Sequence, residues 1–308
     1  MKHNNLKGSI ILCIAAFIWG MAFVAQSGAV DLVSPFMVNA LRNFIGAAAL
    51  YIFYLITNRK QKQKFFPENK ADKKKFLSGG VICGVCLAVA ANFQLFGMAV
   101  YPDGVASEAR AGFLTTLYVI LVPIVAFIIG KRSNVFVWIS VITAFAGVYM
   151  LCFSGGFGGI YFGDILLLIC AFAFTAHIIS IDKFVNFTGG VKLSIMQFLV
   201  TGILSLVLSL AFEIKDYNID NLVSAIIPIL YLGLMSSGVA YTLQIVGQKY
   251  AEPAVASISM SLESVFAALG GWLIAGNGLS NKELIGCTLV FAAIILAQIP
   301  EFSKKGTQ

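Results

Sequence analysis

The stretch PAVASISMSLESVFAALGGWLIA, from Pro253 to Ala275, is long and apolar enough to cross a lipid bilayer, and it carries Glu263 near its middle. A bilayer-spanning helix needs about 20 mostly apolar residues. A carboxylate at that depth costs a few kcal/mol, so Glu263 must face protein, water or a ligand. Two interpretations stay open: Glu263 belongs to a functional site, or it is hydrogen-bonded to a neighbouring helix for packing alone.

The rest of the chain has the composition of a membrane protein. Of its 308 residues 59% are hydrophobic and 11% are charged, and its mean hydropathy is +0.90. Soluble domains carry about 25% charged residues. The net charge of +7 does not indicate nucleic-acid binding, because the basic residues lie between apolar runs and not on an arm or a folded surface.

We predict an all-α polytopic membrane protein with ten transmembrane helices. Ten apolar runs have membrane-spanning length and are bounded by Gly, Pro, Asn or charged residues. They cover residues 8–30, 34–57, 77–100, 104–129, 134–153, 161–185, 191–213, 221–246, 253–275 and 282–300.

The positions of Lys and Arg predict the orientation. If the N-terminus is cytoplasmic, the inner segments hold 17 basic residues, eight of them in the loop 58–76, and the outer connections hold only Lys215 and Lys282. Cytoplasmic loops carry an excess of Lys and Arg. We therefore expect a plasma (inner) membrane protein with both termini in the cytoplasm and a basic cytoplasmic loop at 58–76.

The chain contains an internal repeat. A shift of 155 residues lays GSIILCIAAFIWG, from Gly8, over GDILLLICAFAFT, from Gly163. A shift of 149 brings Gly84 onto Gly233 and Tyr101 onto Tyr250, and a shift of 145 lays TTLYVILVP, from Thr115, over MSLESVFAA, from Met260. The repeats are residues 8–153 and 161–300, each with five spans. Because five is odd, the second repeat starts on the opposite side of the membrane, so we expect two inverted repeats, an arrangement typical of secondary transporters.

Several of these segments resemble the EamA type of the drug/metabolite transporter superfamily. They are AAFIWG ending at Gly20, ALRNF around Arg42, AGFLTTLYVILVP at 111–123, MQFLVTG around Gln197 and SLESVFAALGGWL from Ser261. The resemblance implies ten helices in two inverted repeats and transport of small metabolites, often amino acids. The chain departs from similar sequences at Ser264, where they commonly have Pro, which puts a local kink in doubt.

Helical spacing indicates which residues face a central cavity, since positions three, four and seven apart share a face. In the eighth span, Ser237, Tyr241, Gln244 and Gln248 form a polar stripe that must avoid lipid. The repeat places Asn92 at the position of Tyr241, so we expect Asn92 to face the centre. Gln94, about 200° away on the helix, is expected between helices.

Two further spans place Trp19 and Phe174 at matching positions, and His177 shares a face with Phe174. The rings would suit an apolar or aromatic substrate body, with His177 and Glu263 at its polar end. For these residues, packing in the core is the alternative. Ser259 shares a face with Glu263, and the repeat aligns Glu263 with Tyr118.

The predicted substrate-binding residues are Trp19, Asn92, Tyr118, Phe174, His177, Ser237, Tyr241, Gln244, Ser259 and Glu263. We hypothesise that Glu263 exchanges a proton during transport, with His177 as its candidate partner. Arg42 and its repeat mate Gln197 are expected to have structural roles at helix crossings. Asp103, Glu108 and Arg110 either form a charged group at the mouth of the cavity or stabilise a helix start.

The predicted function is secondary transport of small metabolites, amino acids or related amphipathic compounds, by alternating access, with export as the expected direction. A facilitative uniporter or a channel-like permease is the alternative, and an intramembrane enzyme is a weaker one because HExxH and GxSxG motifs do not occur. We expect no cofactor and no metal. The expected partners are a small-molecule substrate, the lipid bilayer and protons, without nucleic acid, in a monomer or homodimer.

Overall fold

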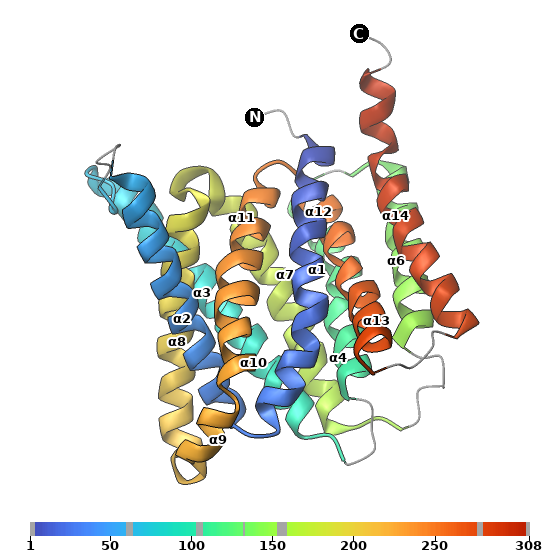
Figure 1. The fold of residues 1–308 in the computed structure, drawn as a ribbon. Coiled ribbons are helices and arrows are strands. Elements are labelled where there is room, and N and C mark those ends of the chain that lie inside the picture. The colour runs from blue at the N-terminus through green and yellow to red at the C-terminus, as the bar shows by residue number, and fades with distance from the viewer. Residues whose placement is uncertain are drawn as a thin grey trace.

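A computed structural model describes residues 4–59, 64–102, 107–131, 133–152, 159–275 and 280–305. Within these ranges the regular structure is entirely helical, and the helices form an upright bundle (Figure 1). The beginning of α1 and the end of α14 lie at the same end of the bundle (Figure 1).

The first half of the chain forms α1 (Asn5–Val30), α2 (Pro35–Asn58), α3 (Lys70–Ala99), α4 (Ser107–Thr116), α5 (Tyr118–Ile128) and α6 (Val135–Cys152). The second half forms α7 (Phe162–Thr188), α8 (Gly190–Phe212), the 3-10 turn η1 (Ile214–Asp216), α9 (Ile219–Ser224), α10 (Ile226–Tyr231), the π-helix η2 (Leu232–Tyr241), α11 (Thr242–Gln248), α12 (Pro253–Met260), α13 (Leu262–Ala275) and α14 (Asn281–Lys305).

Eight helical segments of the described chain are long and apolar enough to cross a membrane. Two shorter apolar helices, Val135–Leu151 and Pro253–Leu269, occupy the fifth and ninth predicted spans. Large apolar side chains such as Ile52, Ile142 and Val207 are exposed on the outside of the bundle, where lipid would cover them. The helical fold is thus confirmed, while ten crossings stay a prediction.

Two spans are interrupted near their middle. The fourth breaks at Leu117, between α4 and α5, and the ninth breaks at Ser261, between α12 and α13. The helix of the ninth span is therefore interrupted without proline at position 264: the Ser264 amide donates to the Ser261 carbonyl, at 3.2 Å, in a tighter turn. These breaks place Tyr118 and Glu263 at the starts of α5 and α13.

The eighth span contains a different irregularity, the ten-residue π-helix η2 between α10 and α11. A π-helix hydrogen-bonds residue i to i+5, so it holds more residues per turn than an α-helix. This changes which side chains of the span lie on one face.

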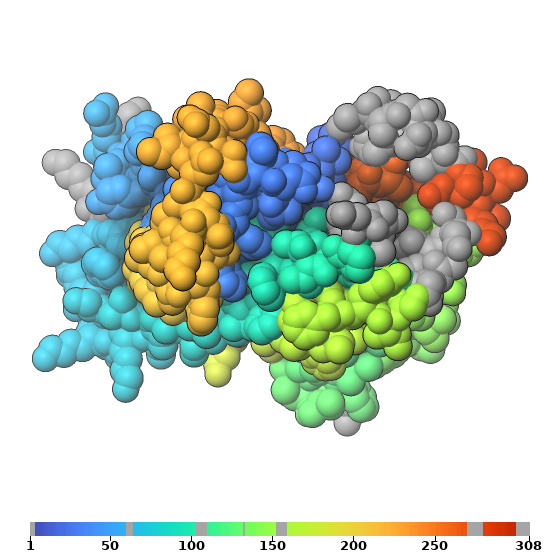
Figure 2. All heavy atoms as spheres, turned by 90° about the horizontal axis from the view of Figure 1, so that it is seen from below, coloured from blue at the N-terminus to red at the C-terminus, as the bar shows by residue number. Residues whose placement is uncertain are grey.

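Helices of the two halves interlock. The main pairs are α3 with α7, α6 with α14, α2 with α8, α3 with α8 and α1 with α13. Small residues allow close approach: a Cβ added at Gly20 of α1 would lie 2.5 Å from Phe266 Cβ of α13. Seen from below, the blue connection between α1 and α2 lies beside the yellow-to-orange region of α8 and α9 (Figure 2).

Candidate functional site

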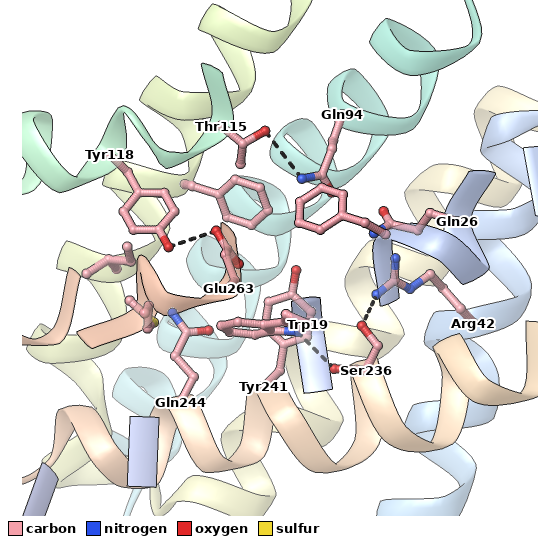
Figure 3. A pocket seen from close by; sticks show the side chains of 14 residues that line it. Trp19, Gln26, Arg42, Gln94, Thr115, Tyr118, Ser236, Tyr241, Gln244 and Glu263 are labelled. Carbon is pink, nitrogen blue, oxygen red and sulfur yellow. Dashed lines mark hydrogen bonds between the residues drawn. The ribbon is translucent and has the colours of Figure 1, made fainter. Parts of the chain in front are cut away.

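A cavity lies where helices of both halves meet. Figure 3 shows how its side chains converge. The lining residues are Trp19, Phe23, Gln26, Arg42, Gln94, Thr115, Tyr118, Phe174, Ile178, Ser236, Tyr241, Gln244, Met260 and Glu263.

Glu263 is 6% exposed and is held by hydroxyl groups from the other half of the chain. The Tyr118 hydroxyl donates to Glu263 Oε1 at 2.9 Å. Thr116 Oγ1 lies 3.3 Å from the same oxygen, but its single proton also has a shorter bond, of 2.6 Å, to the Gly112 carbonyl, so Tyr118 is the main donor. The two helix breaks bring these groups together. The repeat mates Tyr118 and Glu263 therefore meet directly, and no basic residue pairs with this carboxylate in the described chain.

Arg42 lies in the same cavity and is 4% exposed. Its Nη2 donates to Ser236 Oγ at 2.7 Å and its Nε donates to Ser237 Oγ at 3.2 Å, both on η2. Ion pairs in the described ranges join Lys64 to Glu68, Arg110 to Asp164 and Lys131 to Asp182, so Arg42 is bonded only to neutral groups.

Aromatic rings line the space near these charges. Trp19 and Tyr241 pack edge to face with ring centroids 4.8 Å apart, and Trp19 Nε1 donates to the Ser236 carbonyl at 3.3 Å. In Figure 3, Trp19 and Tyr241 lie between Glu263 on one side and Arg42 on the other. The cavity thus offers an apolar surface with a carboxyl group on one side and a guanidinium group on the other.

Three glutamines add amide groups to the lining. Gln26 Oε1 and Gln244 Oε1 are buried without a hydrogen-bond partner. Gln94 Nε2 donates weakly to Thr115 Oγ1 at 3.4 Å. Buried polar atoms are usually satisfied by protein or water, so the two open acceptors are suited to a donor on a bound molecule.

Six of the ten predicted site residues line this cavity: Trp19, Tyr118, Phe174, Tyr241, Gln244 and Glu263. The stripe of the eighth span is buried as expected, with Ser237, Tyr241, Gln244 and Gln248 each at most 7% exposed. Ser237, however, does not line the cavity; Ser236 does. In a π-helix Ser236 and Tyr241 are one hydrogen-bonded turn apart, whereas the prediction assumed α-helical spacing.

The expected positions of Asn92 and Gln94 are corrected by the structure. Asn92 accepts from Asn39 Nδ2 at 3.0 Å and donates to Ser205 Oγ at 2.9 Å, between α2, α3 and α8. Gln94 lines the cavity instead. The prediction assumed that Asn92 faces the cavity because the repeat aligns it with Tyr241 and both spans were taken as α-helices. Since Tyr241 belongs to a π-helix, the two aligned positions do not have to point in the same direction.

His177 and Ser259 lie beside the cavity and do not line it. His177 is fully buried and its Nε2 contacts Gln197 Oε1 at 3.0 Å, so it is bonded to Gln197 rather than to Glu263. The His177 ring centroid lies 6.1 Å from that of Tyr241. Ser259 donates to Ser9 Oγ at 2.7 Å, between α1 and α12.

Eight lining residues were not among the predicted site residues: Phe23, Gln26, Arg42, Gln94, Thr115, Ile178, Ser236 and Met260. Sequence spacing contained a signal for two of them, because Gln26 shares a helical face with Trp19 and Met260 shares one with Glu263. Arg42 was interpreted as a helix-crossing residue, and the structure adds that it also faces the cavity.

Arg110 forms a separate cluster at one end of the bundle. Its Nη1 bonds Asp164 Oδ2 at 2.8 Å, and Tyr101 donates to Asp164 Oδ1 at 2.6 Å. Burial first, and then this hydrogen bond, raise the pKa of Tyr101 above its ordinary value. Asp103 and the side chain of Glu108 lie outside the described residues. Arg110 thus pairs with an aspartate of α7 that sequence spacing did not suggest.

Comparisons with known proteins find matches along nearly the whole chain. The EamA-like transporter family matches residues 6–153 and again residues 161–298. An uncharacterized transporter of Archaeoglobus fulgidus is 29% identical over 305 residues, which cover 96% of this chain and 87% of that protein. The uncharacterized transporter YwfM of Bacillus subtilis is 26% identical over 303 residues, covering 96% of this chain and 94% of that protein.

A solved crystal structure shares the fold. Its TM-score with this chain is 0.74 at 19% identity, and the likeness covers 95% of this chain and 96% of the other.

Proposed function

The chain belongs to the EamA-like transporter family, and from that premise we propose that it is a secondary transporter working by alternating access through the cavity around Glu263. Family membership and the apolar helices make it a multi-pass membrane transporter of small molecules. Our proposal adds the mechanism and the chemistry: amphipathic metabolites such as amino acids, moved outward in exchange for protons.

The packing of the helices supports two repeats related by a twofold axis, and an odd number of spans in each repeat, five, would make the two repeats inverted. If each helix is replaced by its equivalent in the other half, the contact of α1 with α13 becomes a contact of α7 with α4 and α5, which the structure contains. In the same way, the contact of α3 with α7 becomes a contact of η2 and α11 with α1, which is also present. The pairs α2 with α8 and α6 with α14 map onto themselves. Such a pattern is what a twofold axis between the halves produces, and in inverted-repeat transporters the substrate site lies at that interface.

The basic residues support the orientation that we propose, with both termini and the loop 58–76 in the cytoplasm and the chain in the plasma (inner) membrane. The start of α1 and the end of α14 share one end of the bundle (Figure 1). An even number of crossings is consistent with that arrangement.

The observation that carries the proposal is Glu263, a buried carboxylate held by the hydroxyls of Tyr118 and Thr116 inside a cavity between the halves. Without a cationic partner, this group exists at low cost only when it is protonated or solvated. We propose that it takes up and releases a proton as the cavity opens to each side.

The experiment is flux through purified protein in liposomes, with a substrate chosen by thermal-shift screening of amino acids, nucleosides and amines. Glu263→Gln should abolish accumulation driven by a pH gradient while counterflow exchange continues, because the amide keeps the shape of the site and cannot release a proton.

Glu252→Gln is the matched control, since Glu252 precedes the same span and lies outside the cavity. Unchanged pH-driven accumulation in Glu263→Gln would refute proton exchange at Glu263. In the unmodified protein, saturable flux that does not depend on the pH gradient would favour a uniporter. Flux that does not saturate would favour a channel, and a chemically altered product would favour an enzyme.

A further inference from the structure

Arg42 is a buried cation in the cavity that meets no carboxylate of the described chain. We propose that Arg42, oriented by Ser236 and Ser237, is the receptor for a carboxylate on the transported molecule. The substrates are then monocarboxylates or zwitterions that carry an aromatic or branched apolar body. This inference rests on the proposed transport function and assigns the end of the site that binds the anionic group.

The hydrogen bonds of Arg42 leave capacity for a ligand. A guanidinium has five N–H donors in a planar fork. In the structure, Nε and Nη2 donate to the two serines, and Nη1 donates to no other residue of the described chain. A carboxylate is the acceptor that fits such a fork with two parallel bonds.

The energetics of burial favour a ligand over a purely structural role. Two neutral hydroxyls offset only part of the cost of burying a full charge, and a buried charge is normally paired. Within the cavity, Glu263 is engaged by Tyr118 and Thr116 and lies beyond Trp19 and Tyr241 (Figure 3). The positive charge of Arg42 is thus left for a bound anion.

The repeat offers an internal comparison. At the position of Arg42 in the second repeat stands Gln197, which is fully buried, lies outside the cavity lining and bonds His177. Where a side chain only bridges two helices, this chain uses a neutral amide. Where the equivalent position lines the cavity, it uses a charge.

The rest of the cavity suits the remainder of such a molecule. The rings of Trp19, Phe174 and Tyr241 provide an apolar surface near Arg42. Gln26 Oε1, which lies on the Arg42 side of the cavity in Figure 3, is an open acceptor for the ammonium group of a zwitterion. A hydrophobic body with a few placed polar groups is the usual character of a small-molecule site.

The test measures binding of four phenyl probes to the purified full-length protein by isothermal titration calorimetry. The probes are 3-phenylpropanoate, L-phenylalanine, L-phenylalanine methyl ester and phenethylamine. We expect the two carboxylates to bind at least about tenfold more tightly than the ester and the amine, a difference of about 1.4 kcal/mol. Arg42→Gln should weaken carboxylate binding by at least about tenfold, and Arg42→Lys should weaken it less.

Lys192→Gln is the matched control, because it removes a cation of α8 that lies outside the cavity, and it should leave the affinities unchanged. If Arg42→Gln does not fold, the wild-type probe series and Arg42→Lys still decide the question. Equal binding of the acid and its ester, undiminished binding by folded Arg42→Gln, or no carboxylate binding by the wild type overturns the proposal.

The same proteins reconstituted in liposomes separate this inference from the transport mechanism. Arg42-dependent carboxylate binding without saturable flux would leave the receptor role standing and sink the proposed alternating-access function. Saturable flux of an uncharged or cationic substrate that is unchanged in Arg42→Gln would support the transport function and refute the role of Arg42 as carboxylate receptor.

Discussion

At the level of single residues, Glu263 and Arg42 line one cavity, and each is hydrogen-bonded to hydroxyl groups rather than to the other. A direct ion pair would neutralise both charges and leave nothing for a substrate or a proton to bind. Keeping them apart with Trp19 and Tyr241 between them leaves each free to change partners during transport (Figure 3).

Tyr101 gives a prediction about alkaline pH. Its hydroxyl donates to Asp164, and burial raises the pKa of Tyr101, so the folded protein favours the protonated phenol. This preference stabilises the folded protein fully below about pH 10, the pKa of tyrosine in the unfolded chain. The stabilisation is lost as the pH rises through the higher pKa of Tyr101 in the folded protein. We expect Tyr101→Phe to melt below the wild type by a constant margin up to about pH 10, and the margin to shrink above it.

Melting curves in detergent from neutral to alkaline pH measure this margin. The control is Tyr250→Phe, at the repeat-related position, whose hydroxyl makes no hydrogen bond to a carboxylate in the structure. A margin that is already lost near neutral pH, or that grows at alkaline pH, would show that the Tyr101–Asp164 bond does not stabilise the fold in this way.

At the level of elements, the site depends on irregular helices. The breaks at Leu117 and Ser261 bring Tyr118 and Glu263 together. The π-helix η2 contributes Ser236 and Tyr241 to the cavity, and α11, which continues it, contributes Gln244. Interrupted helices at mid-membrane are found where transporters bind their ligands, because protein or a water-filled cavity can satisfy the freed backbone groups.

Gly20 gives a prediction about helix contact. A Cβ at Gly20 would lie 2.5 Å from Phe266 Cβ and 2.8 Å from the Glu263 carbonyl oxygen, so α1 and α13 would have to separate. We expect Gly20→Ala to lower the stability by about 1–3 kcal/mol, as overpacking does, and to impair transport through displacement of Trp19 and Glu263.

Thermal melting in detergent and liposome flux check both effects. Gly28→Ala on the same helix is the control, because a Cβ there meets nothing within 4 Å. That variant should be neutral or slightly stabilising, since Ala favours helix over Gly by about 1 kcal/mol. If the two variants behave alike, the close contact of α1 and α13 is not essential.

The sequence predicts the helical fold well and the site only in part. Long apolar runs follow directly from the cost of exposing polar backbone in lipid. The two positions that the repeat aligns, Tyr118 and Glu263, also share a hydrogen bond in the structure. The residue types of the eighth span give no comparable signal for the π-helix, so the prediction chose Ser237 where Ser236 lines the cavity, although Tyr241 and Gln244 were placed correctly. Asn92 and Gln94 of the third span were assigned to the wrong faces. The hydrogen bonds of His177 and Arg42 depend on tertiary contacts that spacing cannot predict.

At the scale of the whole molecule, ion pairs tie α7 to the fourth span at two distant points. Arg110 pairs with Asp164 near the start of α7, and Lys131, after α5, pairs with Asp182 further along the same helix. Because both ends of the fourth span are tied to α7, we expect these two spans to move together, so that the cavity opens along other helix contacts.

The central claim is that the cavity between the halves lies on the transport path and opens to each side in turn. Its most direct test is the accessibility of Thr115→Cys, a lining residue that is 2% exposed, in protein whose six native cysteines are replaced. Thr143→Cys on α6, which lies outside the cavity lining, is the control.

The measurement is modification by a membrane-impermeant maleimide added to one side or the other of sealed, oriented vesicles. The account predicts that Thr115→Cys reacts from both sides while Thr143→Cys reacts from neither. Reaction of Thr115→Cys from one side only, or from neither side, whatever the pH gradient, would contradict it.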